Sequence, residues 1–264
     1  MSNLPRTYII SLPEASERRE RVSRLCQDNG LNFTIIDAVD GRNFNMLDHP
    51  NYNRKKRLRF FGRDLKGAEL GCALSHKSIY QEMIQKNIDE AIIFEDDIIL
   101  HDGFIDTISV LQNIELNYDM VRFMGRKKVL QAKQRKVKSL DNGVSLTRLC
   151  ATPGGTYAYV IKQSGVKKLL KHLDKVTYPI DALVGRSWET GLNWFSVNKR
   201  LAQVDEDLGS FIGEARFDKT LEIKGLDKML YPLCRLWFRI TEDIGKKYWY
   251  FKTYFSDRKH ANEQ

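Results

Sequence analysis

Three consecutive carboxylates, Glu95, Asp96 and Asp97, interrupt the apolar stretch AIIFEDDIIL at residues 91–100. Burying an unpaired carboxylate is costly, so these groups should be exposed, paired with a basic side chain or bound to a metal ion. Side chains alternate along a strand, so Glu95 and Asp97 share a face if the strand continues through the triplet. An acid-x-acid pair at the C-terminal end of a parallel strand is a suitable ligand set for Mg²⁺ or Mn²⁺, and it leaves coordination sites for a diphosphate. The alternative is a solvated acidic strand end.

The cysteines and histidines form neither of the two common metal-binding pairs. The four cysteines are far apart and contain no C-x-x-C motif, and the five histidines contain no H-x-x-x-H motif. Structural zinc and a zincin-type active site are therefore not expected. In a reducing compartment, the thiols should be free and mostly buried.

The elements that must position the triplet follow an α/β pattern. Nearly continuous apolar runs are expected to be strands, at residues 6–12, 32–41, 91–97 and 119–125. Helices are expected from Pro13 to about Asn29, with Gly30 as the C-terminal cap, and over residues 68–84. Apolar strands joined by helices indicate an α/β fold with a mostly parallel sheet, flanked by helices on both faces.

The second half of the chain continues this pattern. Its expected elements are β segments at 128–139 and 143–150 separated by an Asn-Gly turn, a loop, strand and helix over 153–173, and a further strand with an acidic loop over 192–210. No linker-like stretch is present, so we predict one α/β domain over residues 1–215 and a C-terminal extension over residues 216–264.

The chain is strongly basic. Its 264 residues carry a net charge of +9 with an isoelectric point near 9.3. This favours an anionic partner, which could be nucleic acid, a phosphorylated substrate or an anionic membrane. No apolar run approaches the ~20 residues that a membrane span needs. The N-terminus has only a short apolar core followed by charge, which is unlike a signal peptide, so we expect a cytosolic protein.

The C-terminal extension combines cations with large apolar side chains. Residues 224–260 hold nine Lys or Arg against four Asp or Glu, together with nine aromatic residues. This composition suits a segment that lies on an anionic membrane surface. The alternative is that these aromatic residues pack on the main domain.

Six segments, in this order along residues 5–215, together resemble glycosyltransferase family 25: TYIISLPEASERR, DAVDG, GAELGCALSHKSIYQEMI, AIIFEDDIIL, GTYAYVIKQSGVKKLL and YPIDAL. The family includes bacterial enzymes that extend the outer core of lipopolysaccharide or lipooligosaccharide, with distant relatives that galactosylate collagen. The resemblance implies a GT-A-like fold, a UDP-sugar donor and inversion at the anomeric carbon.

The resemblance also assigns a metal site and a donor site. The metal, Mn²⁺ or Mg²⁺, would be held by Glu95 and Asp97, although the first position of this acid-x-acid motif is Glu rather than Asp here. Arg18 and Arg19 would form a fork for the pyrophosphate, whereas the helical pattern alone favours arginines that snorkel over arginines that point toward an anion. The residues implied in donor binding are Ile10, Ser11, Leu12, Arg18, Arg19, Ser75, His76, Asp96, Gly155 and Tyr157.

Inversion requires a base that takes the proton of the acceptor hydroxyl. Asp181, in YPIDAL, matches the second acidic motif of the family and is the leading candidate for this role. Glu189 and the acidic run at 205–207 are competitors. Asp181 could instead cap a helix that starts at residue 182.

The predicted function is therefore transfer of a hexose from UDP-galactose or UDP-glucose to a lipid-anchored oligosaccharide, by an enzyme peripheral to the cytoplasmic face of the inner membrane. A metal-dependent phosphotransferase or nuclease could use the same carboxylates. A nucleic-acid-binding protein fits the charge but is disfavoured, because no recognition motif is present and the most distinctive segment is acidic.

Overall fold

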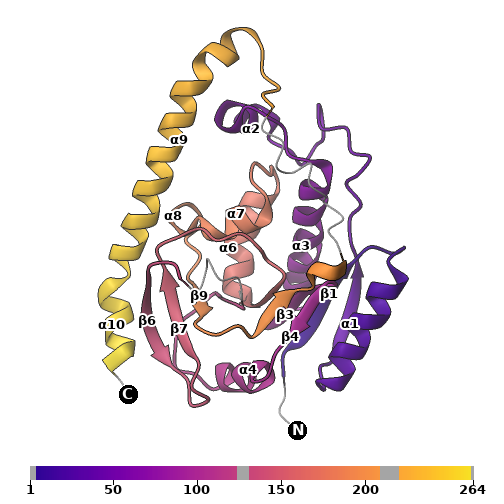
Figure 1. Cartoon of the computed structure of the whole chain (residues 1–264), viewed down its shortest axis with the longest axis vertical. Coiled ribbons are helices and arrows are strands. Elements are labelled where there is room, and N and C mark those ends of the chain that lie inside the picture. The colour runs from indigo at the N-terminus through magenta and orange to yellow at the C-terminus, as the bar shows by residue number, and fades with distance from the viewer. Residues whose placement is uncertain (1–3, 124–130, 209–219, 263–264) are drawn as a thin grey trace.

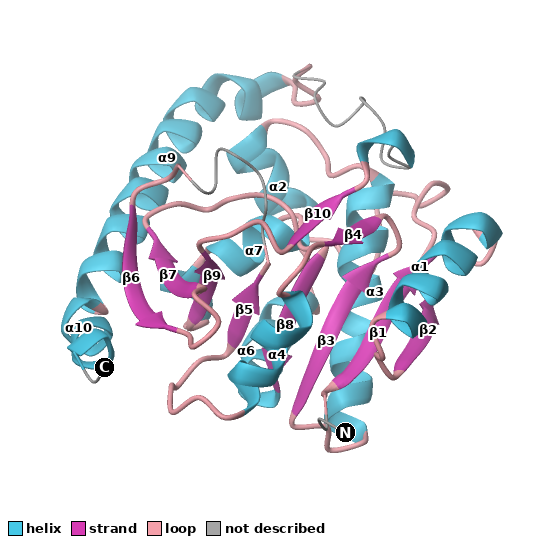
Figure 2. Cartoon of the chain, turned by 60° about the horizontal axis from the view of Figure 1, so that its bottom comes forward, coloured by secondary structure: helices cyan, strands magenta, loops and turns pink. Residues whose placement is uncertain are grey.

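The central sheet has eight strands in the order β2-β1-β3-β8-β5-β9-β7-β6, among the residues that this computed structural model describes: 4–123, 131–208 and 220–262 (Figures 1 and 2). The strands are β1 (Arg6–Ser11), β2 (Phe33–Asp37), β3 (Glu90–Glu95), β5 (Met120–Arg122), β6 (Gln134–Ser139), β7 (Ser145–Leu149), β8 (Ala158–Lys162) and β9 (Trp194–Val197). Strands β7 and β8 run opposite to the other six of these eight strands, which share one direction. The predicted mostly parallel sheet is confirmed.

Helices cover both faces of this sheet, as predicted. One face packs against α1 (Ser16–Asp28) and α4 (Phe104–Gln112). The other face packs against α3 (Gly67–Gln85), α6 (Gln163–Leu173) and α7 (Ile180–Gly185). The remaining short elements are α2 (Arg54–Phe61), α8 (Ser187–Thr190), the antiparallel pair β4 (Ile98–Leu100) and β10 (Ala202–Val204), and the 3₁₀ turn η1 (Glu206–Leu208).

Alternation along the strands explains why they read as continuous apolar runs. In β1, Ile9 points to one core, whereas Tyr8 and Ile10 point to the other. In β3, Ile92 and Ile93 divide in the same way. A strand buried on both faces needs apolar side chains at odd and even positions alike.

The basic segment RKKRLRFFGR, at residues 54–63, contains helix α2. The side chain of Asn53 caps α2 by accepting a hydrogen bond from the backbone N–H of Lys56 at 3.2 Å. Gly62 ends the helix with φ +71°, a left-handed conformation that favours glycine. The predicted β segment at 128–139 begins outside the described residues, and β6 forms its described part.

The C-terminal extension forms two helices, α9 (Gly225–Lys252) and α10 (Tyr254–Asn262), which run along the β6 edge of the sheet (Figure 1). Phe238 of α9 is buried against Phe60 and Phe61 of α2. Among the described residues, no helix combines the length and apolar character needed to cross a membrane.

Candidate active site

A cleft opens where the parallel strands β1 and β3 end, at their C-terminal edge, where α/β folds bind ligands. Its volume is about 740 Å³, including the solvent at its mouth. Eight residues predicted for the site line it: Ile10, Ser11, Leu12, Arg18, Ser75, Glu95, Asp96 and Asp97. The lining also includes residues that the sequence analysis assigned no role: Ala38, Val39, Asp40, Gly41, Arg42, Ala68 and Cys72.

The acidic triplet does not continue as a strand. Strand β3 ends at Glu95, and a turn follows before β4. This turn buries Asp96, which accepts hydrogen bonds from Ser11 Oγ at 2.5 Å and from Arg18 Nη1 at 3.3 Å. Asp96 is therefore a paired carboxylate that joins β1 and α1 to the end of β3.

The other two carboxylates of the triplet have much less compensation. Asp97 Oδ1 is buried without a hydrogen-bond partner among the described residues. Burial and the charge of Asp96 raise the pKa of Asp97. For Glu95, burial and the neighbouring carboxylates, Asp97 foremost, raise the pKa to about 8. Its side-chain hydrogen bond, from Thr156 Oγ1, is long at 3.4 Å. Two oxygen-bearing groups that repel each other, one of them with an orphaned atom, fit a divalent cation that prefers oxygen ligands.

Arg18 and Arg19 of α1 hold the rim of the cleft together. Arg18 donates to Asp96 and to the backbone carbonyl of Leu208, at 2.7 Å. Arg19 donates to the carbonyls of Leu12 and Ser11, at 3.0 and 2.8 Å, and to Asp37. Arg18 lines the cleft. Arg19 does not line it and instead links the end of β1, at Ser11, to the end of β2, at Asp37.

The loop that contains DAVDG forms one wall of the cleft. The Ser75 hydroxyl accepts from the backbone N–H of Val39 and donates to the carbonyl of Gly71, both at 2.8 Å. A Cβ atom on Gly41 would lie only 1.9 Å from the carbonyl oxygen of Gly67, so this loop and α3 can approach only as glycine backbones. Arg42 lies at the exposed end of this wall and pairs with carboxylates of the same surface.

Asp181 and Gly155 lie together on another side of the triplet. Asp181 Oδ2 accepts from the Gly155 N–H at 3.0 Å, and Oδ1 accepts from the N–H of Ala182 at 2.7 Å. The charge of Asp181 contributes to the raised pKa of Glu95, which places these carboxylates in one electrostatic cluster. The capping alternative is wrong, because α7 begins at Ile180 with Pro179 as its N-cap, and Asp181 lies inside the helix rather than before it. Asp181 instead faces the acidic cluster.

Buried Arg122 holds the loop that contains Gly155 through hydrogen bonds to backbone carbonyls. Its guanidinium donates to the carbonyls of Pro153, at 3.1 Å, and of Gly155. Gly155 has φ +95°, which favours glycine at this position. Tyr157 belongs to the core and reaches the site through its backbone, because its carbonyl accepts from the N–H of Glu95 at 2.9 Å.

The two competitors of Asp181 for the role of base lie in different places. Glu189 is on α8, where it pairs with Arg186 at 2.7 Å and lines a different cavity beside His172 and Lys56. The structure does not bring it to the cleft. The acidic run 205–207 lies beside the triplet, because the backbone N–H of Asp205 donates to the carbonyl of Asp97 at 2.6 Å. The Asp205 carboxylate forms an ion pair with Arg21 at 2.8 Å.

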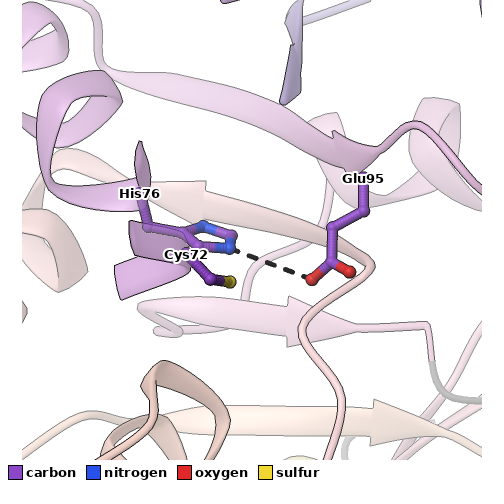
Figure 3. A group of neighbouring side chains, drawn as sticks. All are labelled: Cys72, His76 and Glu95. Carbon is purple, nitrogen blue, oxygen red and sulfur yellow. Dashed lines mark ion pairs between the residues drawn. The ribbon is translucent and has the colours of Figure 1, made fainter. Parts of the chain in front are cut away.

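His76 lies beneath the cleft rather than on its surface. Its Nδ1 is 2.7 Å from the hydroxyl of Tyr159, and its Nε2 faces Glu95 and Cys72 (Figure 3). Burial lowers the pKa of His76 to about 3, so the ring is neutral at physiological pH. The spacing of Cys72 and His76, four residues apart on α3, was readable in the sequence as C-x-x-x-H. The sequence did not indicate that both side chains lie close to Glu95.

The sequence of this chain matches glycosyltransferases. The model of "Glycosyltransferase family 25 (LPS biosynthesis protein)" matches residues 4–184, which is more than half of the chain. The chain therefore belongs to glycosyltransferase family 25.

Several curated proteins are similar to the chain over part of their length. The Drosophila melanogaster "Glycosyltransferase 25 family member" is 32% identical over 192 residues, which make up 68% of this chain and 30% of that protein. The Rattus norvegicus "Probable inactive glycosyltransferase 25 family member 3" is 30% identical over 175 residues, 62% of this chain and 29% of that protein. The Xenopus laevis "Procollagen galactosyltransferase 1-A" is 28% identical over 172 residues, with 62% and 27% covered. The chain thus spans less than a third of the length of these relatives.

Proposed function

We propose that the chain is an inverting glycosyltransferase of the GT-A type that transfers a hexose from a UDP-sugar, galactose in first place and glucose as the alternative. The observation that carries the proposal is the cleft at the ends of β1 and β3, where Asp97 has an oxygen without a partner and neighbouring carboxylates raise the pKa of buried Glu95 to about 8. Family membership and the name of the Xenopus laevis relative favour a galactosyl donor.

Within this proposal, each wall of the cleft has a task. Glu95 and Asp97 would hold Mn²⁺ or Mg²⁺, which supplies a positive charge against the charge that develops on the leaving UDP. Ile10, Ser11 and Leu12, at the end of β1, line the part of the cleft proposed for the nucleotide. Asp96 would act indirectly, because its bonds to Ser11 and Arg18 hold the rim in place.

The proposed base is Asp181. A carboxylate that accepts the proton of an acceptor hydroxyl must be fixed relative to the donor, and Asp181 is fixed by the N–H groups of Gly155 and Ala182. Glu189 would have no part in this step, because it pairs with Arg186 and lines a different cavity.

The wild-type chain tests the proposal directly. We expect it to release UDP from UDP-galactose or UDP-glucose in the presence of Mn²⁺, and faster when a lipopolysaccharide core oligosaccharide is added, because the donor then has an acceptor. Released UDP is measured with and without EDTA for each donor. Absence of UDP release with either donor, together with UDP affinity that Mn²⁺ does not change, would contradict the proposal.

The exposed face of α9 and α10 supports the proposal that the acceptor lies at a membrane surface. Large apolar residues recur there every three or four positions and are exposed, Trp237 by 64% and Phe255 by 82%. The other members of this apolar stripe are Leu226, Met229, Leu230, Leu233, Leu236, Ile240, Ile244, Tyr248 and Phe251. Phe238 and Tyr250 are buried instead, so the aromatic residues of this segment divide between packing and exposure.

Exposed cations accompany the apolar stripe. They are Lys224, Lys228, Arg239, Lys247, Lys252, Arg258 and Lys259. Each basic residue near an anionic leaflet contributes about 1 kcal/mol to binding. We therefore propose that the stripe docks on the anionic cytoplasmic face of the inner membrane, where a lipid-anchored oligosaccharide would be the acceptor.

Vesicle flotation tests this docking. We expect the chain to float with anionic phospholipid vesicles at low salt, and Trp237→Glu to weaken flotation because it places a charge in the apolar stripe. Leu47→Glu is the matched control, since Leu47 is 69% exposed but lies outside the stripe. If the wild type stays in the soluble fraction, the docking proposal fails, and a dimer in light scattering would then assign the stripe to a second copy of the chain.

A further inference from the structure

Cys72, His76 and Glu95 place three different ligand atoms in one small region at the floor of the cleft (Figure 3). One sulfur, one imidazole nitrogen and one carboxylate oxygen all lie within 4.8 Å of one another. Cys72 and His76 are one turn apart on α3 and therefore point to the same side of that helix. Glu95 approaches from the end of β3.

The imidazole of His76 is unpartnered on the side that faces this region. His76 is fully buried, and its Nε2 has no hydrogen-bond partner among the described residues. The nearest carboxylate oxygen, Glu95 Oε1, is 4.0 Å away, which is too far for a hydrogen bond. A buried polar atom without a partner is costly, so the position of Nε2 calls for a ligand.

The opposite ring nitrogen has the support that metal-binding histidines usually have. His76 Nδ1 is 2.7 Å from the Tyr159 hydroxyl, which is 2.8 Å from the hydroxyl of Tyr80. When Nδ1 carries the proton and donates it to Tyr159, the lone pair of Nε2 points toward Cys72 and Glu95. A hydrogen bond of this kind orients a ligating imidazole and strengthens it as a ligand.

We propose that Cys72, His76 and Glu95 form a three-ligand site for a zinc-class cation. Sulfur and imidazole ligands favour Zn²⁺ over Mg²⁺ or Mn²⁺, which prefer oxygen. On binding, the Cys72 thiol loses its proton to solvent and the sulfur bonds to the cation as a thiolate. Cys72 and Glu95 both line the cleft, so the fourth coordination position would open onto it.

Glu95 belongs both to this site and to the proposed Mn²⁺ or Mg²⁺ site, so zinc binding should affect the proposed function. This effect rests on the proposed function, whereas the zinc-class site itself does not. Glu95 would be a ligand both in the zinc-class site and, with Asp97, in the site for Mn²⁺ or Mg²⁺. The two cations would therefore compete, and Zn²⁺ would inhibit Mn²⁺-dependent UDP release by withdrawing Glu95 from Asp97.

Cobalt(II) is a suitable probe, because its bond to a thiolate gives an absorption band that oxygen ligands do not give. The full chain, without any sugar nucleotide, is titrated with Co²⁺ and then with Zn²⁺. We expect one equivalent of Co²⁺ to bind with a thiolate band that Zn²⁺ abolishes. Absence of this band in the wild type would overturn the proposal, whatever the outcome of the UDP-release assay.

Variants locate the bound ion. Cys72→Ser should remove the thiolate band, and Glu95→Gln, at the cleft surface, should weaken Zn²⁺ binding by more than the roughly 10–100-fold typical of losing an outer-shell partner. Cys150→Ser is the matched cysteine control, and Asp97→Asn should leave Zn²⁺ binding unchanged. An unchanged band in Cys72→Ser, or equal loss in Asp97→Asn and Glu95→Gln, would assign the cation to a different site. Circular dichroism confirms that each variant is folded.

Discussion

Replacing Asp97 by asparagine should abolish Mn²⁺-dependent UDP release without destabilising the chain. The lost carboxylate is the one whose Oδ1 has no partner, so its removal deprives a cation of a ligand but breaks no hydrogen bond to that atom. Loss of electrostatic stabilisation of this kind typically costs roughly 10²–10³-fold in turnover.

Asp97→Asn should lower turnover, but it should not lower the free energy of unfolding. Because burial and Asp96 raise the pKa of Asp97, the folded chain disfavours the ionised carboxylate. In the absence of metal, the Asp97 contribution to the free energy of unfolding therefore falls as the pH rises from the ordinary pKa through the raised one. Asparagine has no charge, so the variant should be at least as stable as the wild type at neutral pH. Thermal melts with EDTA measure this, and a clear loss of stability would show that Asp97 is a structural residue.

Asp181→Asn is the matched comparison for turnover. As the proposed base, Asp181 should contribute about 10²–10⁴-fold to turnover but little to the affinity for UDP and Mn²⁺. The two variants should therefore separate, since Asp97→Asn loses metal-dependent UDP binding and Asp181→Asn retains it. Near-normal turnover in Asp181→Asn would remove this residue from the mechanism. A wild type that binds the donor but transfers nothing would instead place the chain beside the relatives named as inactive.

Asp257→Ala should lower the free energy of unfolding by about 3–5 kcal/mol, because it leaves buried Arg148 and half-buried Arg135 without a counter-charge. Asp257 on α10 is 1% exposed and forms ion pairs with Arg135 of β6 and Arg148 of β7. Arg148 donates to both of its oxygens, at 2.7 and 2.9 Å. This cluster fastens the C-terminal helix to the edge of the sheet.

Equilibrium denaturation of the full chain measures this prediction. Asp243→Ala is the matched control, since Asp243 lies on the same C-terminal segment and pairs with Lys247, but both side chains are more than half exposed. Exposed pairs contribute about 0–1 kcal/mol. Equal effects of the two substitutions would show that the C-terminal helices add little to the stability of the sheet.

The sequence by itself determined the α/β architecture and the place of the triplet. Period and length identified β1, β3 and α3, because a strand with both faces buried and a helix against a sheet each require a local apolar pattern. Gly30 adopts the left-handed conformation expected of a C-terminal cap, with φ +66°. The order of six short segments also identified the family, which the family model confirms.

Only the tertiary structure decided how the individual side chains are used. The bond between Ser11 and Asp96 joins residues 85 positions apart, and it makes Asp96 the paired member of the triplet. The sequence also did not indicate that Glu189 lines a different cavity, or that Cys72 and His76 lie close to Glu95. Local pattern states which face of an element is buried, whereas the partner of a buried polar atom depends on which distant elements meet there, and that is settled only when the sheet and its helices pack.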